Sequence, residues 1–223
     1  MPIDHWLNSL PQASSRFVET DLDALAGPTA YPFLNAGTVR AQITRLSGHL
    51  AREDEPGRRL AIGYSLYLRQ MDVIQEASVR TACAGACPRP PVGCCNAEHH
   101  MILSTADLMF SLPSPAALRL AHVITGMQRR ERDHSASQGM ALTSGHCSCL
   151  SATGCALRLF KSPRCAHYLC PDVENTLLLR HGEKASAFIG AMRAMARGTI
   201  SSSRDFTSPP VLAAAALIFP QMA

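Results

Sequence analysis

Residues 57–80 read GRRLAIGYSLYLRQMDVIQEASVR, and this stretch decides the fold class. Apolar or small side chains recur in it at alternating steps of three and four positions, which is the period of one helix face. The members of this stripe are Leu60, Tyr64, Tyr67, Met71, Ile74 and Ser78. Pro56 suits a first helical turn, and the acidic residues 53–55 favour the positive end of a helix dipole. The pattern predicts an amphipathic helix over residues 57–80.

The same period predicts further helices on both sides of this stretch. One covers residues 36–51, and another begins at Ser114-Pro115 and runs toward Arg132. A long helix opens at Asp172 and ends at Gly198. Its stripe consists of Leu178, His181, Ala185, Phe188, Met192 and Met195.

The remaining segments carry weaker patterns. Residues 1–34 are expected to be irregular with a short helix, and residues 133–145 are polar and predicted to form a loop. The apolar segment Val211–Phe219 is interpreted as a buried C-terminal helix or an interface. No alternating pattern of useful length predicts a strand.

We therefore expect a mainly α protein, a helical domain with two irregular cysteine-rich metal-binding loops inserted between helices. Its 223 residues are compatible with a single domain, 1–223. Within it, residues 35–82 hold the N-terminal helices, 83–171 the cysteine-rich metal-binding region, and 172–223 the C-terminal helices.

Composition narrows the classes of function. Hydrophobic residues make up 47% and charged residues 17%, and the net charge is +4. No run of Lys and Arg with interleaved aromatics appears, so no nucleic-acid partner is indicated. The N-terminus lacks the charge and apolar run of a signal peptide, and no segment approaches the ~20 apolar residues of a membrane span. These features predict a cytoplasmic protein without a membrane span.

The nine cysteines are confined to the middle of the chain. None occurs in residues 1–82 or 171–223, whereas cysteines used as small buried apolar residues would be scattered. Cytoplasmic thiols are kept reduced, and an odd number fits poorly with complete pairing in disulfides. Metal ligation is therefore the expected role of the cysteines as a set.

The first cluster has the spacing Cys83-x3-Cys87-x6-Cys94-Cys95 and carries Pro88, Pro90, Pro91 and Gly93. Such residues break regular structure and let a loop fold back, as the convergence of thiolates on one ion requires. Adjacent side chains such as Cys94 and Cys95 rarely reach one ion without strain.

The second cluster has the spacing Cys147-x-Cys149-x5-Cys155-x9-Cys165-x4-Cys170. Arg158, Lys161 and Arg164 lie between its cysteines. They could offset the thiolate charge and lower the thiol pKa values. Whether the two clusters form separate sites or one shared centre stays open at this point.

In order and local context, residues 83–171 resemble bacterial cysteine-cluster proteins described as zinc- or iron-chelating, the YkgJ type. The resemblance rests on Cys94-Cys95, on C-x-C-L at 147–150, on Gly154-Cys155, and on P-R-C-A-H-Y-L-C at 163–170. In one departure, six residues with three prolines separate Cys87 from Cys94, a longer spacing than the family has.

The resemblance implies a set of metal ligands. They are Cys83, Cys87, Cys94, Cys95, Cys147, Cys155, Cys165 and Cys170. Cys149 stands where the family has an aromatic residue, so it is expected to be a spare, buried thiol. A similar cysteine pattern in flagellin lysine N-methylases implies an iron–sulfur cluster.

Other polar residues near the clusters have plainer interpretations. His99, His100, His146 and His167 are conceivable zinc ligands, but roles beside the metal or at the surface are expected. The charged run 129–133 is expected to be a solvated helix end.

All-cysteine ligation suits both an iron–sulfur cluster, such as 4Fe-4S, and zinc. The irregular spacings and the absence of a C-x2-C knuckle favour iron–sulfur. The leading hypothesis is a metal-binding protein with a redox, chelating or accessory role and possibly a protein partner. The alternatives are a cluster-dependent enzyme related to protein lysine methylases, and a helical interaction module pinned by structural zinc.

Overall fold

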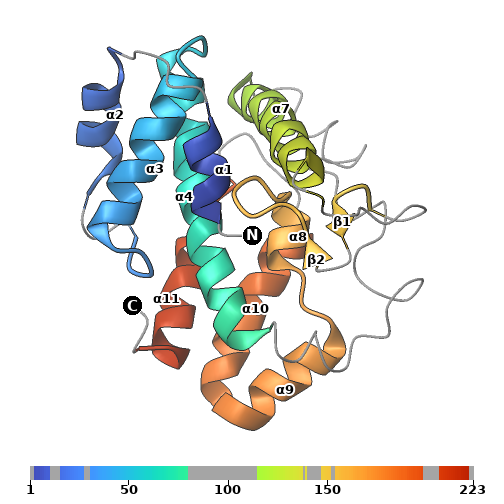
Figure 1. The fold of residues 1–223 in the computed structure, drawn as a ribbon. Helices are drawn as coiled ribbons and strands as arrows, with labels where there is room; N and C mark the ends of the chain where they lie inside the picture. Colours follow the sequence, from blue (N-terminus) through green and yellow to red (C-terminus); the bar gives the residue numbers. More distant parts are fainter. Residues whose placement is uncertain are drawn as a thin grey trace.

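The chain is mainly helical, as the sequence predicts (Figure 1). The structure, a computed structural model, describes residues 3–10, 16–27, 31–79, 115–137, 139, 147–151, 154–197 and 206–220. The helices are α1 (Ile3–Ser9), α2 (Val18–Leu25), α3 (Ala36–His49), α4 (Glu55–Ser78), α7 (Pro115–Ser137), α8 (Pro163–His167), α9 (Pro171–His181), α10 (Glu183–Arg197) and α11 (Pro209–Ile218). The first cysteine cluster, at 83–95, lies outside the described residues.

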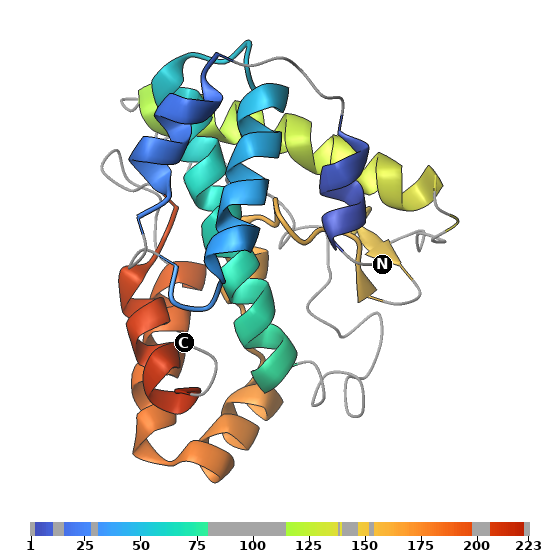
Figure 2. The same ribbon diagram turned by 60° about the vertical axis from the view of Figure 1, so that its left-hand side comes forward.

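Helix α4 confirms the prediction made from residues 57–80. Asp54 caps its N-terminus by accepting a hydrogen bond from the Gly57 N–H at 3.0 Å, and Pro56 occupies the first turn. The helix packs against α2, α3 and α7. In Figures 1 and 2 it runs from the end formed by α2 and α3 toward α9 and α10. Because α4 has neighbours on several sides, Ile62 and Leu66 are buried although neither belongs to the predicted stripe.

The N-terminal segment contains α1 and α2, more regular structure than the single short helix expected. Helix α2 is held to α4 by an ion pair in which Arg58 Nε lies 2.6 Å from Asp21 Oδ2. Both side chains are buried, and the Arg58 guanidinium also lies 4.3 Å from the centre of the Phe17 ring. Burial raises the pKa of Asp21, but hydrogen bonds and the charge of Arg58 outweigh it, so the pKa is lowered overall.

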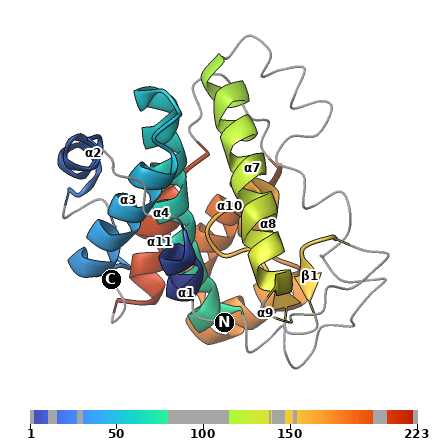
Figure 3. The ribbon, with the colours of Figure 1, turned by 45° about the horizontal axis from the view of Figure 1, so that its top comes forward.

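Helix α7 extends to Ser137, so the expectation of a loop from residue 133 onward was wrong for residues 133–137. The polar sequence there belongs to a helix because part of it faces protein. Glu131 and Ser135, one turn apart, are both buried. The solvated end expected for 129–133 was therefore wrong for Glu131. Figure 3 shows α7 beside α8 and β1, on the other side of α4 from α2 and α3.

The long helix predicted over 172–198 is two helices, α9 and α10. They are separated by Gly182, which has a φ of 56° and a ψ of −138°. Only glycine adopts such a conformation readily, so the chain changes direction there. The redirected α10 packs on α8, α9 and α11. Leu178, a member of the predicted stripe, is consequently 41% exposed.

Two short strands were not predicted from the sequence. β1 (Leu150–Ser151) pairs antiparallel with β2 (Gly154–Cys155), with Leu150 opposite Cys155. Two residues are too few to produce an alternating pattern. None of the helices in the described part of the chain combines the length and apolar character that crossing a membrane requires.

Candidate metal centre

Cys147 and Cys149 lie in a tight turn that leads into β1. The N–H of Leu150 donates to the carbonyl of Cys147 at 3.0 Å, which closes the turn. The N–H of Cys149 points at the sulfur of Cys147, with nitrogen and sulfur 3.4 Å apart. A backbone N–H directed at sulfur stabilises the thiolate, the form that binds metal.

The hairpin brings Cys155 back to this turn. The N–H of Ala156 donates to the carbonyl of Cys149 at 2.8 Å, continuing the β1–β2 pairing. Cys147, Cys149 and Leu157 are buried together, with Cys155 packed against them, in an apolar cluster separate from the main core. A hydrogen bond with the Cys147 side chain, and then burial and nearby thiolate charge, raise the pKa of Cys149.

Cys165 lies in the short helix α8. Ser162 caps this helix, its hydroxyl oxygen accepting a hydrogen bond from the Cys165 N–H at 3.2 Å. Burial, together with the charges of Cys155 and Cys147, raises the pKa of Cys165 to about 12, against the opposing effects of Ser162 and Lys161.

Cys170 has different surroundings. It is half-buried at the N-terminus of α9 and packs against the main hydrophobic core. Of the predicted second-cluster ligands, the structure thus packs Cys147 and Cys155 together, with Cys149 beside them, and places Cys170 against the main core. None of these five cysteines is in a disulfide bond. Among the described residues, no three or more His, Cys, Asp or Glu side chains are positioned to hold one metal ion.

The hairpin is anchored by Glu131, whose importance the sequence did not reveal. One carboxylate oxygen accepts hydrogen bonds from the N–H groups of Arg158 and Leu159, at 2.5 and 3.1 Å. The other accepts from the N–H of Phe160 at 3.2 Å. Burial outweighs these bonds and raises the pKa of Glu131 to about 7. A single side chain of α7 therefore fixes the segment that follows the hairpin.

Helix α4 places two cations beside the thiols. Arg158 donates to Asp72 at 2.9 Å, while Lys161 lies 3.6 Å from Asp72 and donates to Gln75 at 3.2 Å. The Lys161 charge lowers the pKa values of Cys155 and Cys165, and Cys155 acts on Arg158 in turn. Burial still raises the pKa of Cys155 overall. Of the three basic residues expected to offset thiolate charge, Lys161 acts in that direction, but burial outweighs it and the thiol pKa values of Cys155 and Cys165 stay raised.

His167 has a structural role. Its Nδ1 lies 2.5 Å from the carbonyl oxygen of Pro163, which can only accept, so Nδ1 carries the proton. Nε2 then accepts from the hydroxyl of Tyr67. Burial lowers the pKa of His167 to about 4. With both ring nitrogens engaged, His167 is not placed to bind metal; His99, His100 and His146 lie outside the described residues.

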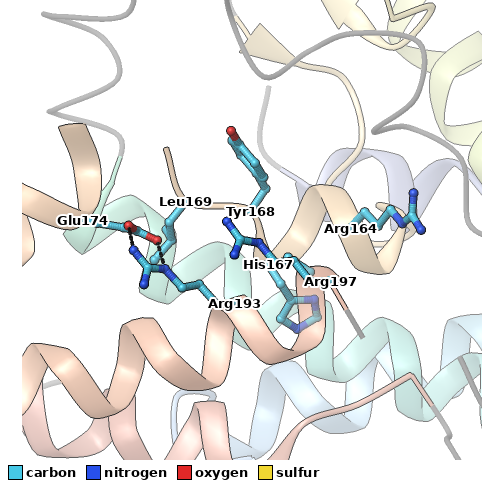
Figure 4. A pocket seen from close by; sticks show the side chains of 8 residues that line it. Arg164, His167, Tyr168, Leu169, Glu174, Arg193 and Arg197 are labelled. Atoms are coloured by element: carbon cyan, nitrogen blue, oxygen red, sulfur yellow. Dashed lines mark hydrogen bonds and ion pairs between the residues drawn. The ribbon is translucent and has the colours of Figure 1, made fainter. Parts of the chain in front are cut away.

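A basic pocket opens on the segment between Cys165 and Cys170 (Figure 4). Its volume is about 350 Å³. The lining residues are Arg164, His167, Tyr168, Leu169, Glu174, Arg193, Ala196 and Arg197. The lining contains three arginines but a single carboxylate, Glu174, to which Arg193 donates at 2.6 Å. The sequence offered no sign of this pocket, because α8 and α10 meet only in the folded chain.

Comparisons of the chain with models of protein families, with curated proteins and with solved structures found no match. The cysteine-cluster resemblance therefore stays an expectation carried by the residues quoted for it.

Proposed function

We propose that this protein binds metal through cysteine thiolates, as an iron–sulfur protein with a redox, chelating or accessory role. The supporting observation is the packing of Cys147, Cys149 and Cys155 together at one short hairpin, with the charges of Lys161 and Arg158 interacting with Cys155. Soft thiolate donors suit iron–sulfur clusters and zinc. Buried cations reduce the electrostatic repulsion among closely spaced thiolates.

The second-cluster residues fit such a centre by their chemistry. The Cys149 N–H directed at the Cys147 sulfur is the kind of hydrogen bond that stabilises a ligating thiolate and tunes a metal centre. The raised pKa values of Cys149 and Cys165 describe neutral, metal-free thiols. Metal binding would release their protons and draw the sulfurs together, coupling ligation to local folding.

The experiment is anaerobic purification followed by absorption spectroscopy and analysis of iron, zinc and acid-labile sulfide. An iron–sulfur protein is brown, with broad absorption near ~400 nm from sulfur-to-iron charge transfer. Colourless protein with stoichiometric zinc and no sulfide would show that the bound metal is zinc and not an iron–sulfur cluster. Protein that takes up neither metal under reducing conditions would overturn the proposal.

A second candidate function is an enzyme that acts beside the centre, and the basic pocket is the observation that favours it. Arginine-lined pockets suit ligands that carry carboxylate or phosphate groups. Inorganic phosphate should then raise the midpoint of thermal unfolding, and Arg197→Ala should abolish that rise. Arg180→Ala is the control, because Arg180 is exposed on α9 and does not line the pocket. An equal response of both variants would remove this support.

A further inference from the structure

We propose that the basic pocket between α8 and α10 binds a small phosphate monoester. The three arginines of its lining, Arg164, Arg193 and Arg197, hold the phosphoryl group. Tyr168 and Leu169 contact the organic group. This assignment rests on the second candidate function, an enzyme acting beside the centre, and narrows it to one class of ligand. Metal binding does not depend on it, because the lining residues that the structure describes include no cysteine.

The C-terminal ends of two helices bring the arginines together. Arg164 lies in the last turn of α8 and Arg197 in the last turn of α10, and these two helices pack against each other. Arg193 precedes Arg197 by four residues on the same helix, so both side chains leave α10 on one face. Figure 4 shows both on the side of α10 that faces the segment with Tyr168 and Leu169.

The lining carries an excess of positive charge. It contains three guanidinium groups and one carboxylate, that of Glu174, which leaves two positive charges in excess. His167 adds no charge at pH 7, because its Nδ1–H donates to Pro163, its Nε2 accepts from Tyr67, and burial lowers its pKa to about 4. A phosphate monoester carries a charge of about −1.5 to −2 at pH 7. It therefore balances this excess, whereas a monocarboxylate does not.

Glu174 fixes the orientation of one of the arginines. Arg193 donates from Nε to Oε1 of Glu174 at 2.6 Å and from Nη2 to Oε2. Glu174 itself is buried, so it is a firm anchor. These bonds use two of the five N–H donors of the guanidinium, and the Nη1 group takes no part in them. A guanidinium held in this way loses less freedom when it binds an oxyanion.

The pocket is larger than an inorganic ion requires. Its volume of about 350 Å³ lies in the range of small-molecule sites, roughly 300–1,000 Å³. Leu169 is buried in its lining, and Tyr168 is 36% exposed. An organic group that covers such side chains gains affinity by removing apolar area from water. The pocket therefore fits an ester of phosphate better than the free ion.

The first test compares three probes by isothermal titration calorimetry of the wild-type chain, in HEPES buffer at pH 7.5 and constant ionic strength. Phenyl phosphate has both the ring and the double charge, benzoate has the ring with a single charge, and inorganic phosphate has the charge without the ring. We expect phenyl phosphate to bind at least ~10-fold more tightly than either of the others. Benzoate that binds as tightly as phenyl phosphate would overturn the phosphoryl assignment. Inorganic phosphate that does so would overturn the organic group.

The second test localises the ligand to the pocket. Arg197→Ala should weaken binding of phenyl phosphate about 10- to 100-fold, as for loss of a charge-assisted hydrogen bond. Arg197→Lys should recover only part of this loss, because an ammonium group lacks the planar fork of guanidinium. Arg180→Ala removes the same charge from an exposed position of α9 outside the lining, and should leave the Kd within about twofold of wild type. Equal weakening by both alanine variants would show general attraction of anions and overturn the site.

The outcomes separate this inference from the proposed functions. If inorganic phosphate stabilises the protein but phenyl phosphate binds no more tightly, the pocket is an anion site and only the monoester assignment fails. If none of the probes binds, the inference fails together with the second candidate function. The role of Arg164 and Arg197 is then to balance the negative ends of α8 and α10. Iron, zinc and sulfide measured in the same samples decide metal binding independently.

Discussion

Glu131 on α7 accepts a hydrogen bond from the backbone N–H of Arg158 at 2.5 Å, and its two oxygens also hold the N–H groups of Leu159 and Phe160. This contact joins α7 to the segment that connects the cysteine hairpin with α8. Helix α4 reaches the same segment, because Tyr64 donates to the carbonyl of Lys161 and Asp72 pairs with Arg158. The segment that follows the cysteine hairpin, residues 158–161, is therefore held by contacts with both α7 and α4.

Replacing Glu131 should destabilise the protein strongly. Glu131→Ala leaves three backbone N–H groups of a buried segment without their acceptor, and each such group costs roughly 1–3 kcal/mol. We expect the free energy of unfolding to fall by at least ~3 kcal/mol in urea denaturation at pH 6. Asp133→Ala is the matched control, since Asp133 lies on the same helix with its side chain 60% exposed. Equal losses in the two variants would contradict the anchoring role.

The raised pKa of Glu131 predicts a pH dependence of stability. The folded protein holds the proton up to about pH 7, whereas the unfolded chain releases it near the ordinary value of 4.5. Between these values the folded state binds more protons, so stability falls as pH rises. The loss is on the order of 3 kcal/mol across this window, at 1.36 kcal/mol per unit of pKa.

Urea unfolding of wild type and Glu131→Gln from pH 4 to 8 measures this effect. The Gln side chain does not titrate. The free energy of unfolding of wild type minus that of Glu131→Gln should therefore decline from about pH 4.5 to about 7 and level off beyond. A difference that stays constant over this range would show that Glu131 titrates normally.

Gly182→Ala should destabilise the turn between α9 and α10. A φ of 56° with a ψ of −138° is strained for any residue with a Cβ, at a cost of roughly 1–3 kcal/mol. Gly190→Ala in α10 is the control. Its added methyl meets nothing within 4 Å. Alanine is the better helix former, so this change should stabilise by up to ~1 kcal/mol. The midpoint temperature of thermal unfolding should fall for Gly182→Ala and rise for Gly190→Ala.

Breaking the buried ion pair between α2 and α4 should be costly. Arg58→Met leaves the buried Asp21 carboxylate with the partly exposed Arg59, at 3.2 Å, as its cationic partner among the described residues. Losing one member of a buried pair typically costs ~3–5 kcal/mol. Arg119→Met removes an exposed pair with Asp54, which contributes about 0–1 kcal/mol. Adding Asp21→Asn to Arg58→Met should restore part of the free energy of unfolding. If the losses of the two single variants simply add in the double variant, the two side chains are not directly coupled.

The sequence by itself determined the helices whose stripes and start signals are local. Asp54 and Pro56 set the start of α4, and apolar spacing predicted α3 and α4 almost to their ends. It also singled out the cysteines, because their confinement to the middle of the chain is visible without any structure. These features depend on residues within a few positions of one another.

Tertiary structure decided what depends on distant partners. Residues 133–137 are polar and read as a loop, yet they are helical where α7 carries Glu131 and Ser135 toward the hairpin segment. Gly182 lies within the span of the stripe that predicted one long helix over 172–198. Its positive φ, visible only in the structure, divides that span into α9 and α10. Likewise, the cysteine spacing alone does not distinguish Cys149 from Cys170. Their surroundings differ because the hairpin turns one toward the other thiols while α9 packs the other on the main core.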